Sequence, residues 1–411
     1  MKNNILSFGD FITESKNTHM THIEDKVLYG GVNGTRQAIN ALRDLRDMLG
    51  GKKDGSVSVK WDGAPAIFAG TDPRDGEFFV AKKGIFNATP KVYKTAAEVD
   101  ADTSGDLATK LKDALNYLPA LGIKGVIQGD FLFGRGDITT KDIDGESYST
   151  FHPNTIVYAI PYKQAAEVRK AKIGIVWHTT YTGSSFETMK ASYGVDVAGL
   201  NKSKNVWSRD AMLRDARGAT MTSKETAEVT SILSSAGTVF NSIASSTLSQ
   251  LENDQKLAQL IEQFNNTYVR EGKLITNTKR HTENLIKWIK KKYQKEIDSR
   301  KTQKGKTAQQ RKLDEILSFF SASNKASLIK MFELQRLIVL AKLKLINKLN
   351  SVGKYKTFVK SANGYKVTGQ EGYVAIDTLG GDAVKLVDRM EFSYNNFSPD
   401  ILKGWQKPTR R

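Results

Sequence analysis

The stretch VKWDGAPA, Val59 to Ala66, places a lysine, an aspartate and a glycine at the expected end of a buried strand. Lys60, Asp62 and Gly63 stand close together between a glycine-rich turn and an apolar run. Such a corner has two interpretations. The lysine is either a solvated residue at a strand end or a nucleophile held beside a carboxylate and a flexible turn. The rest of the sequence has to decide between the two.

Composition narrows the classes of protein to consider. The chain has 411 residues, enough for about two to three domains. Its net charge of +18 predicts a polyanionic partner, for which nucleic acid is the default. It has no cysteine, which excludes disulfides and cysteine-ligated zinc. We expect no secretory signal, because Asp10 interrupts the short stretch after Lys2. We expect no membrane partner, because lysines interrupt even the most apolar run, residues 337–349.

Short β-branched or aromatic runs, separated by glycine, predict strands on both sides of a long helical region. Helical spacing of apolar residues predicts helices at 34–49, ended by Gly50 and Gly51, at 107–118, and throughout about 207–350. The expected strands are SVSVKW (56–61), GEFFVAKKG (76–84), KGVIQGDFLFG (124–134), TIVYAIP (155–161), KIGIVWHTTYTG (172–183), KTFVKS (356–361), YKVTGQEGYVAID (365–377) and DAVKLVDRMEF (382–392).

Most of the excess positive charge lies in the helical region. Residues 270–348 hold 21 lysines and arginines against 7 aspartates and glutamates. Within it, SRKTQKGKTAQQRK (299–312) is expected to be an exposed basic loop. Trp288 and Tyr293 are candidates either for stacking on bases or for helix packing. The lysines expected to contact nucleic-acid phosphates, independently of base sequence, are Lys287, Lys290, Lys291, Lys292 and Lys295.

A lysine that attacks phosphorus needs companions from elsewhere in the chain. Acidic residues must hold a metal, and further cations must spread the charge of phosphoryl transfer. The sequence offers Asp130 in one expected strand, Glu371 at the start of another, and Lys385 within the next. His178 is interpreted as a structural residue.

In this order the motifs resemble the covalent nucleotidyltransferase superfamily, which contains polynucleotide ligases and mRNA capping enzymes. KWDG fits the motif of the adduct-forming lysine, which implies Lys60 as the nucleophile and Asp62 beside the nucleotide. FFVAKKG resembles the next motif, which implies Lys82 or Lys83 at the ribose or a phosphate. QGDF is similar to the motif that contacts the ribose, which implies Asp130.

Three later stretches extend the resemblance. IVYAIP resembles the strand whose aromatic residue stacks on the purine, which implies Tyr158. EGYV is close to the metal-binding motif of phage RNA ligases, which implies Glu371, together with Asp130, as a ligand of Mg²⁺ or Mn²⁺. VKL resembles the last motif, which implies Lys385 on the α-phosphate of ATP.

The chain departs from the family pattern at three places. Pro65 and Ala66 follow the first motif where an arginine is usual, and Asp130 is one methylene shorter than the usual glutamate. Val387 occupies the position of a second lysine in the last motif. These departures keep open the alternative of a catalytically degenerate protein.

The resemblance implies an α+β fold, in which a nucleotidyltransferase domain with ATP-grasp-like antiparallel sheets is interrupted by a large basic α-helical insertion. Residues 15–205 and 354–395 would form that domain, and residues 206–353 the insertion. Residues 396–411 would be a basic tail.

The first fourteen residues, MKNNILSFGDFITE, resemble the capsid-targeting peptides of T-even-like phage internal head proteins. A prohead protease removes such peptides after an apolar-x-Glu sequence, which Ile12, Thr13 and Glu14 fit. The resemblance implies a location in the virion head interior, the host cytoplasm, or both. The prohead protease and the capsid interior would then be partners. The alternative is a frayed terminus.

The leading hypothesis is therefore an ATP-dependent polynucleotide ligase-like adenylyltransferase that forms a lysyl-AMP intermediate and joins or adenylylates nucleic-acid ends. A second hypothesis is a degenerate nucleotidyltransferase-fold protein that binds DNA and is packaged in the phage head. A third is a guanylyl- or adenylyltransferase that acts on RNA ends or on protein. RNA and DNA, and nicked and single-stranded ends, stay open as substrates.

Overall fold

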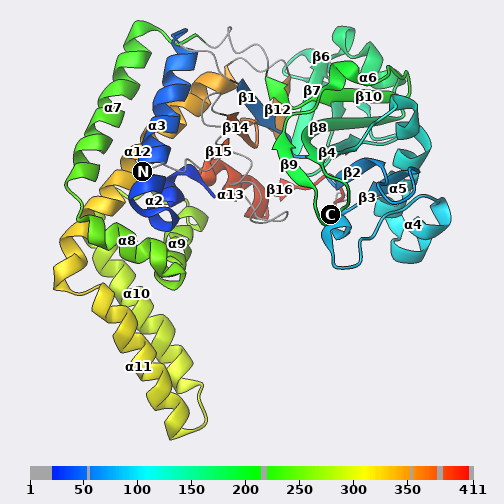
Figure 1. Ribbon diagram of the computed structural model, residues 1–411. Coiled ribbons are helices and arrows are strands. Elements are labelled where there is room, and N and C mark those ends of the chain that lie inside the picture. Colours follow the sequence, from blue (N-terminus) through cyan, green and yellow to red (C-terminus); the bar gives the residue numbers. More distant parts are fainter. Residues whose placement is uncertain (1–20, 53–55, 214–219, 352–354, 377–382, 407–411) are drawn as a thin grey trace, which may run out of the picture.

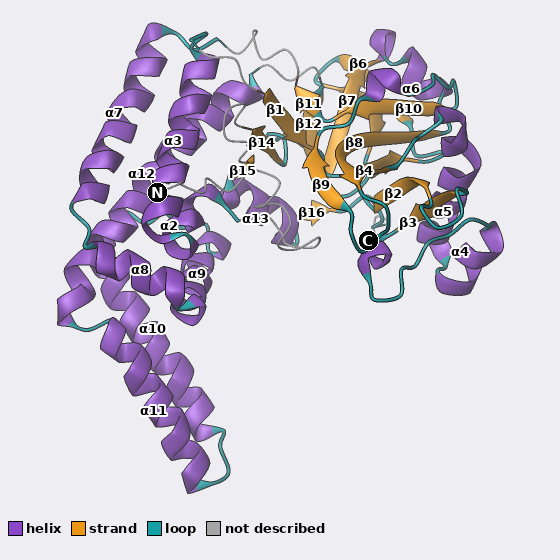
Figure 2. Cartoon of the chain, viewed as in Figure 1, coloured by secondary structure: helices purple, strands orange, loops and turns teal. Residues whose placement is uncertain are grey.

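The structure is a computed structural model that describes residues 21–52, 56–213, 220–351, 355–376 and 383–406 (Figure 1). It belongs to the α+β class, with a helical unit on one side and antiparallel sheets on the other (Figure 2). The expected capsid-targeting peptide, residues 1–14, lies outside the described residues. In the described part of the chain, no helix combines the length and the apolar character that a membrane crossing needs.

In the described part of the chain, the helical unit combines two helices that precede the first strand with the six helices of residues 223–350. Helix α3 packs against α7, α8 and α12, so the expected insertion shares its core with residues that precede the first strand. The helices of the unit are α2 (Lys26–Tyr29), α3 (Gly31–Leu49), α7 (Ser223–Asn241), α8 (Ser245–Asn253), α9 (Gln255–Arg270), α10 (Thr278–Asp298), α11 (Gln303–Phe319) and α12 (Ala322–Asn350).

Helix α3 forms where the apolar spacing predicts it. Ala38, Leu42, Leu45 and Leu49 are buried on one face, and the backbone N–H of Gly50 closes the helix on the Arg46 carbonyl. The prediction for residues 34–49 is confirmed, although the helix starts three residues earlier.

The expected basic loop at 299–312 is wrong, because helix α11 begins at Gln303. The Thr302 hydroxyl accepts a hydrogen bond from the Gly305 backbone N–H, 3.1 Å away, and caps the helix. Glutamine, lysine, alanine and arginine then continue it as good helix formers, and Leu313 is buried against the neighbouring helices. Only residues 299–302 connect α10 to α11.

Three sheets form the other half of the molecule. The first has the order β11-β1-β14-β15 and the second β10-β8-β4-β2-β3, with β9 also paired to β8. The third has the order β13-β12-β7-β6-β5, with β16 also paired to β12. Described strand pairs are antiparallel, apart from β10 beside β8.

The bounds of the strands in the first sheet are β1 (Ser56–Lys60), β11 (Met212–Leu213), β14 (Gly372–Ile376) and β15 (Ala383–Leu386). Those of the second are β2 (Ala66–Thr71), β3 (Phe78–Ala81), β4 (Val126–Phe133), β8 (Ile173–Thr182), β9 (Lys190–Tyr193) and β10 (Val206–Asp210). Those of the third are β5 (Thr139–Ile143), β6 (Glu146–Phe151), β7 (Ile156–Pro161), β12 (Lys356–Ser361), β13 (Gly364–Val367) and β16 (Ile401–Leu402).

Helices α4 (Ala96–Asp102), α5 (Gly105–Tyr117) and α6 (Ala166–Lys170) accompany the sheets. Two boundaries differ from the expectation. The helices begin at Ser223, because residues 206–213 still form strands β10 and β11. The expected strand 382–392 ends at Leu386, and helix α13 (Arg389–Phe397) follows, capped by the Asp388 carboxylate, which accepts from the backbone N–H of Met390 and Glu391. The expected tail also starts later, since β16 pairs with β12.

An aromatic core joins the sheets. The Trp61 ring contacts the rings of Tyr158, Trp207 and Tyr355 at centroid distances of 4.7, 6.3 and 5.7 Å. Trp61 directly follows β1, Tyr158 lies in β7, Trp207 lies in β10, and Tyr355 directly precedes β12. Aromatic pairs at such distances stabilise a core beyond the area they bury. Trp61 therefore fixes the position of the residues on either side of it, Lys60 and Asp62.

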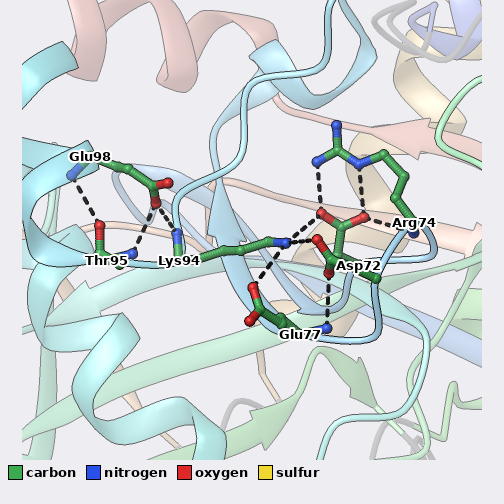
Figure 3. Close-up of polar contacts among 7 residues, drawn as sticks. Asp72, Arg74, Glu77, Lys94, Thr95 and Glu98 are labelled. Atoms are coloured by element: carbon green, nitrogen blue, oxygen red, sulfur yellow. Dashed lines mark hydrogen bonds and ion pairs between the residues drawn. The ribbon is translucent and has the colours of Figure 1, made fainter.

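A polar network fixes the turn between β2 and β3 (Figure 3). The buried Asp72 carboxylate accepts two hydrogen bonds from the Arg74 guanidinium, at 2.9 and 2.7 Å, and pairs with Lys94 at 3.3 Å. Next to Lys94, Thr95 and Glu98 form a reciprocal capping box at the start of α4. The network therefore attaches α4 to the edge of the second sheet and has a structural role.

Candidate active site

Strands β1 and β14 bring the two ends of the sequence pattern together. Lys60, the last residue of β1, lies opposite Gly372, so the preceding residue, Glu371, reaches the lysine side chain. Lys60 Nζ forms an ion pair with Glu371 Oε1. The Glu371 side chain is only 10% exposed, whereas the Lys60 side chain is 35% exposed, so the lysine is the more accessible member of the pair.

Asp130 approaches the same place from the second sheet. The turn after Lys60 lies directly on β4, since a Cβ added at Gly63 would come within 2.5 Å of the Asp130 Cβ. The glycine of KWDG is therefore needed for close packing. His178 on β8 lies beside Asp130, with Nε2 3.9 Å from Oδ2.

Burial perturbs both acids of this cluster. Burial raises the pKa of Glu371 to about 7, although the ammonium of Lys60 opposes the shift. Burial likewise raises the pKa of Asp130 to about 7, again opposed by Lys60 and assisted by the charge of Asp62. Two carboxyl groups that titrate near neutrality beside an amine are typical of a site that moves protons.

A second lysine and a histidine complete the cluster. Lys385 lies in β15, opposite Val374, and burial together with repulsion from Lys60 lowers its pKa. Burial, with the charge of Lys60, lowers the pKa of His178 to about 4, so its imidazole is neutral at pH 7. Lys60 thus interacts electrostatically with the three other expected residues, Asp130, Glu371 and Lys385, and Glu371 also interacts with Asp130 and Lys385.

Asp62 has a structural position. Its buried carboxylate accepts hydrogen bonds from Asn154 Nδ2 and from the backbone N–H groups of Thr155 and Ile156, at 2.6, 2.6 and 2.8 Å. These bonds hold the turn after Lys60 against the loop before β7. The carboxylate is therefore committed to the protein, and the expected contact of Asp62 with a nucleotide is not supported.

Tyr158 does not present a stacking surface. It is fully buried, its ring packs on Trp61 and Phe151, and its hydroxyl accepts a hydrogen bond from the Asp62 backbone N–H at 2.7 Å. The expectation that Tyr158 stacks on the purine is corrected accordingly. Its role in this structure is to support the turn that carries Lys60.

Neither lysine of FFVAKKG joins the cluster through a contact among the described residues. Lys82 Nζ pairs with Asp102 Oδ2 at 3.3 Å and lies 5.7 Å from the centroid of the Tyr93 ring. Lys83 is exposed in the turn after β3. The structure therefore shows Lys82 bound to α4 and leaves Lys83 at the surface.

The α10 lysines lie on a helical hairpin of α10 and α11 that extends away from the rest of the helical unit (Figure 1). Trp288 and Tyr293 pack against the helical core, which supports their packing interpretation. Lys292 is half-buried and lies over Trp288, with its ammonium also bonded to Gln263. The exposed members of the set are Lys287, Lys290, Lys291 and Lys295.

A family profile matches residues 17–400, nearly the whole chain. The chain belongs to DUF6267, a family of unknown function. No curated protein and no solved structure matches it. Because the match spans both the helical unit and the sheets, the cluster around Lys60 lies within the part of this DUF6267 protein that defines the family.

In this DUF6267 site, the carboxylate oxygens of Asp130 and Glu371 suit a hard divalent cation only when a bound phosphate ligand completes the coordination. Within the described residues, no three histidine, aspartate or glutamate side chains gather in the manner of a metal site. Mg²⁺ commonly takes only one or two protein carboxylates and completes its shell with phosphate oxygens and water. Asp130 and Glu371 fit that pattern.

The cluster of this DUF6267 protein includes one residue whose role the sequence did not indicate, His178. It stands after the apolar run IGIVW, where its side chain could face either a core or a site. The register between β4 and β8 is interrupted beside it, between Gln128 and Gly129, and this irregularity directs its ring towards Asp130. Only the unexplained polar residue in an apolar strand could have signalled it.

Proposed function

We propose that this protein is an ATP-dependent polynucleotide ligase-like adenylyltransferase in which Lys60 forms a lysyl-AMP intermediate. One observation carries the proposal: the amine of Lys60 interacts with the carboxyl groups of Asp130 and Glu371 and with the ammonium of Lys385, although these residues come from β1, β4, the residue before β14, and β15. The order of these residues in the chain is also that of the nucleotidyltransferase motifs. Antiparallel sheets around the cluster are compatible with that fold.

The first step is an attack by Lys60 Nζ on the α-phosphorus of ATP. The N–P bond forms, the bond between the α-phosphorus and the bridging oxygen breaks, and pyrophosphate leaves. The ammonium must first lose a proton, and Glu371 Oε1 is in contact with it. Because burial raises the pKa of Glu371 to about 7, this carboxylate accepts a proton near neutral pH.

The second and third steps use the nucleic-acid end. An oxygen of a 5′-phosphate attacks the adenylyl phosphorus, the N–P bond breaks, and the Lys60 amine is regenerated. A 3′-hydroxyl then attacks the activated 5′-phosphate and displaces AMP. Throughout, Lys385 would lie on the α-phosphate and spread its charge.

A divalent ion, Mg²⁺ or Mn²⁺, would supply positive charge to the triphosphate when bound. The resemblance implies both Glu371 and Asp130 as ligands of the ion. Because Glu371 contacts Lys60, we assign Glu371 as the proton acceptor and the ion to Asp130 and the phosphates. His178, neutral at pH 7, stands beside Asp130 without adding a competing charge.

The test is covalent labelling with ATP that carries a radiolabel on the α-phosphate. Wild-type protein is expected to retain the label after denaturation, and acid but not alkali is expected to release it, as a phosphoramidate requires. Lys60→Ala should lose labelling by several orders of magnitude. Lys170→Ala, a change of an exposed lysine on α6, should retain it. Absence of label from the wild type with every common nucleotide and both ions refutes the proposal.

A second function is favoured by a specific observation: Asp62, Tyr158 and Lys82 are engaged within the protein. Together with the departures at Pro65, Asp130 and Val387, this supports a degenerate nucleotidyltransferase-fold protein that binds DNA inside a phage head. That function predicts no adduct and nucleic-acid binding that Lys60→Ala leaves unchanged.

A further inference from the structure

Helix α13 has an inner and an outer face of opposite character. On the inner face Ser393 and Asn395 are buried, and the Glu391 carboxylate accepts hydrogen bonds from the Thr368 hydroxyl and the Gly369 backbone N–H, at 2.6 and 2.9 Å. On the outer face Tyr394 is 48% exposed and Phe397 is 72% exposed. The helix therefore presents two aromatic rings to solvent, one turn apart.

One neighbouring strand extends this outer face, and a second segment is attached to α13. Lys366 of β13 places its ammonium 5.7 Å from the centroid of the Tyr394 ring. The segment after β16 carries Trp405, which is 64% exposed. Lys403 attaches this segment to α13, since its Nζ donates to the Asn395 carbonyl at 2.8 Å. We call Lys366, Tyr394 and Phe397 the aromatic face, and Trp405 is a further exposed ring on the segment that Lys403 attaches to α13.

Exposed large hydrophobic side chains are concentrated around α13. Among the described residues, seven large hydrophobic side chains are exposed; Tyr394 and Phe397 belong to this face, and Trp405 lies on the segment that Lys403 attaches to α13. Clustered exposed apolar side chains mark an interaction surface more often than isolated ones do.

The aromatic face adjoins the candidate active site through α13 itself. The helix begins four residues after Lys385. Its inner side, with Phe392 and Asn396, lines a small cavity of about 10 Å³ that Glu371 and Asp62 also line. In Figure 1, α13 lies between the helical unit and the sheets. A strand lying on the face would thus be one helix away from Glu371.

We propose that the aromatic face binds unpaired bases of a nucleic-acid strand and holds them beside the candidate active site. The exposed groups are π-systems rather than aliphatic side chains, and a lysine already occupies a cation–π position over one of them. Alternating aromatic and cationic groups are the usual platform for single strands, because every base has a π-face and every nucleotide a phosphate.

The net charge of +18 favours an anionic strand over a peptide or a second copy of this equally basic chain. The α10–α11 hairpin complements the face, because its exposed side chains include many lysines whereas Trp288 and Tyr293 are packed inward. It suits the phosphate backbone, and the aromatic face suits the bases. This inference rests on the proposed function for its meaning in catalysis. It adds to that function the ligand of the aromatic face, an unpaired strand beside the reacting end.

The experiment compares binding of three fluorescent probes: a single strand of about 16 nucleotides, the same strand with abasic sites, and a blunt duplex. The variants are Tyr394→Ser and Phe397→Ser. Tyr162→Ser is the matched control. Tyr162 is about as exposed as Tyr394, but it lies outside the aromatic face, where its ring packs under Arg169. Melting temperatures of all variants establish that the fold is retained.

Each face variant is expected to bind the single strand about 5- to 150-fold more weakly, and to bind the abasic strand and the duplex like the wild type. Tyr162→Ser should bind all three normally. Equal binding of the single strand by the variants and the wild type overturns the proposal. So does equal binding of the intact and abasic strands by the wild type, or a wild-type dimer that the face variants dissolve, because the face would then cover a second copy.

Adduct formation is measured on the wild type in a separate reaction without nucleic acid. Its absence would refute the adenylyltransferase function and leave base-dependent binding at the aromatic face intact. Loss of base-dependent binding with adduct formation retained would refute only the present inference.

Discussion

Lys342, in the middle of α12, donates hydrogen bonds to both carboxylate oxygens of Glu24, at 2.8 and 2.9 Å, and both side chains are buried. Arg389, the first residue of α13, lies 3.5 Å from the same carboxylate and 2.8 Å from Asp25. His22, two residues before Glu24, pairs through its backbone with Lys385. This buried ion network therefore attaches the helical unit to the strand that carries Lys385.

Breaking this ion pair from one side is expected to be costly. Lys342→Met leaves the Glu24 carboxylate buried without its main partner and should lower the free energy of unfolding by about 3 to 5 kcal/mol. The double variant Glu24→Leu with Lys342→Met removes both charges and should recover most of that loss. Denaturant unfolding measures both. Lys344→Met, which breaks a half-exposed pair with Glu228, should cost less than about 1 kcal/mol. Equal effects at Lys342 and Lys344 would contradict the burial argument.

The pH dependence of adduct formation should follow the carboxyl group that contacts the nucleophile. Burial raises the pKa of Glu371 to about 7, so this group is protonated below that pH and can no longer take the proton of Lys60. The rate of labelling should therefore fall about tenfold per pH unit below pH 7. Initial rates across the neutral range measure it. A rate that is constant down to about pH 5 would exclude Glu371 as the proton acceptor.

The same raised pKa predicts a cost in stability at high pH. Between the ordinary value of 4.5 and the folded value of about 7, the folded protein holds a proton on Glu371 that the unfolded chain has lost. This stabilising contribution is present at low pH and is lost as the pH rises through about 7. Glu371→Gln should thus match the wild type at about pH 4 and exceed it by about 3 kcal/mol at about pH 9. Melting curves at both pH values measure it, and a difference independent of pH would contradict the buried position of this carboxyl group.

The α10 lysines should contribute to duplex binding through salt-dependent contacts alone. Changing the exposed Lys287, Lys290, Lys291 and Lys295 together to Gln should reduce the slope of log affinity against log salt by about 3 to 4 units, if each contacts one phosphate. Titrations at several salt concentrations give the slope. A control changes four exposed lysines of the sheet side to Gln, namely Lys141, Lys163, Lys170 and Lys190. An equal loss in the control would mean that net charge, and not the hairpin, determines binding.

The spacing of apolar residues predicted those helices and strands that depend mainly on their own sequence. The strand KTFVKS coincides with β12, and the apolar spacing of α3 and the glycine stop after it are in place. Where the expectation failed, a short polar signal outweighed the general pattern. Thr302 starts α11 inside an apparently loop-like basic run, and Asp388 converts the end of an expected strand into α13.

The candidate site was predicted in part. Motif order led to Lys60, Asp130, Glu371 and Lys385, which the fold brings together. It also led to Asp62, Tyr158 and Lys82, which are engaged with Asn154, Trp61 and Asp102. These partners come from distant segments, and a single sequence does not contain the information that pairs them. Lys342 shows the same limit, because a lysine in an apolar helix looks exposed until Glu24 is placed beside it.

The proposed function depends most on the chemistry of one amine, so mapping the covalent adduct tests that function most directly. Wild-type protein is incubated with ATP and Mg²⁺ or Mn²⁺, digested under alkaline conditions, and analysed by mass spectrometry. The proposed adenylyltransferase function predicts an added AMP on the peptide that contains Lys60. The corresponding peptide from Lys60→Ala should carry no AMP. An adduct on another residue, or no adduct with any nucleoside triphosphate, would contradict that function.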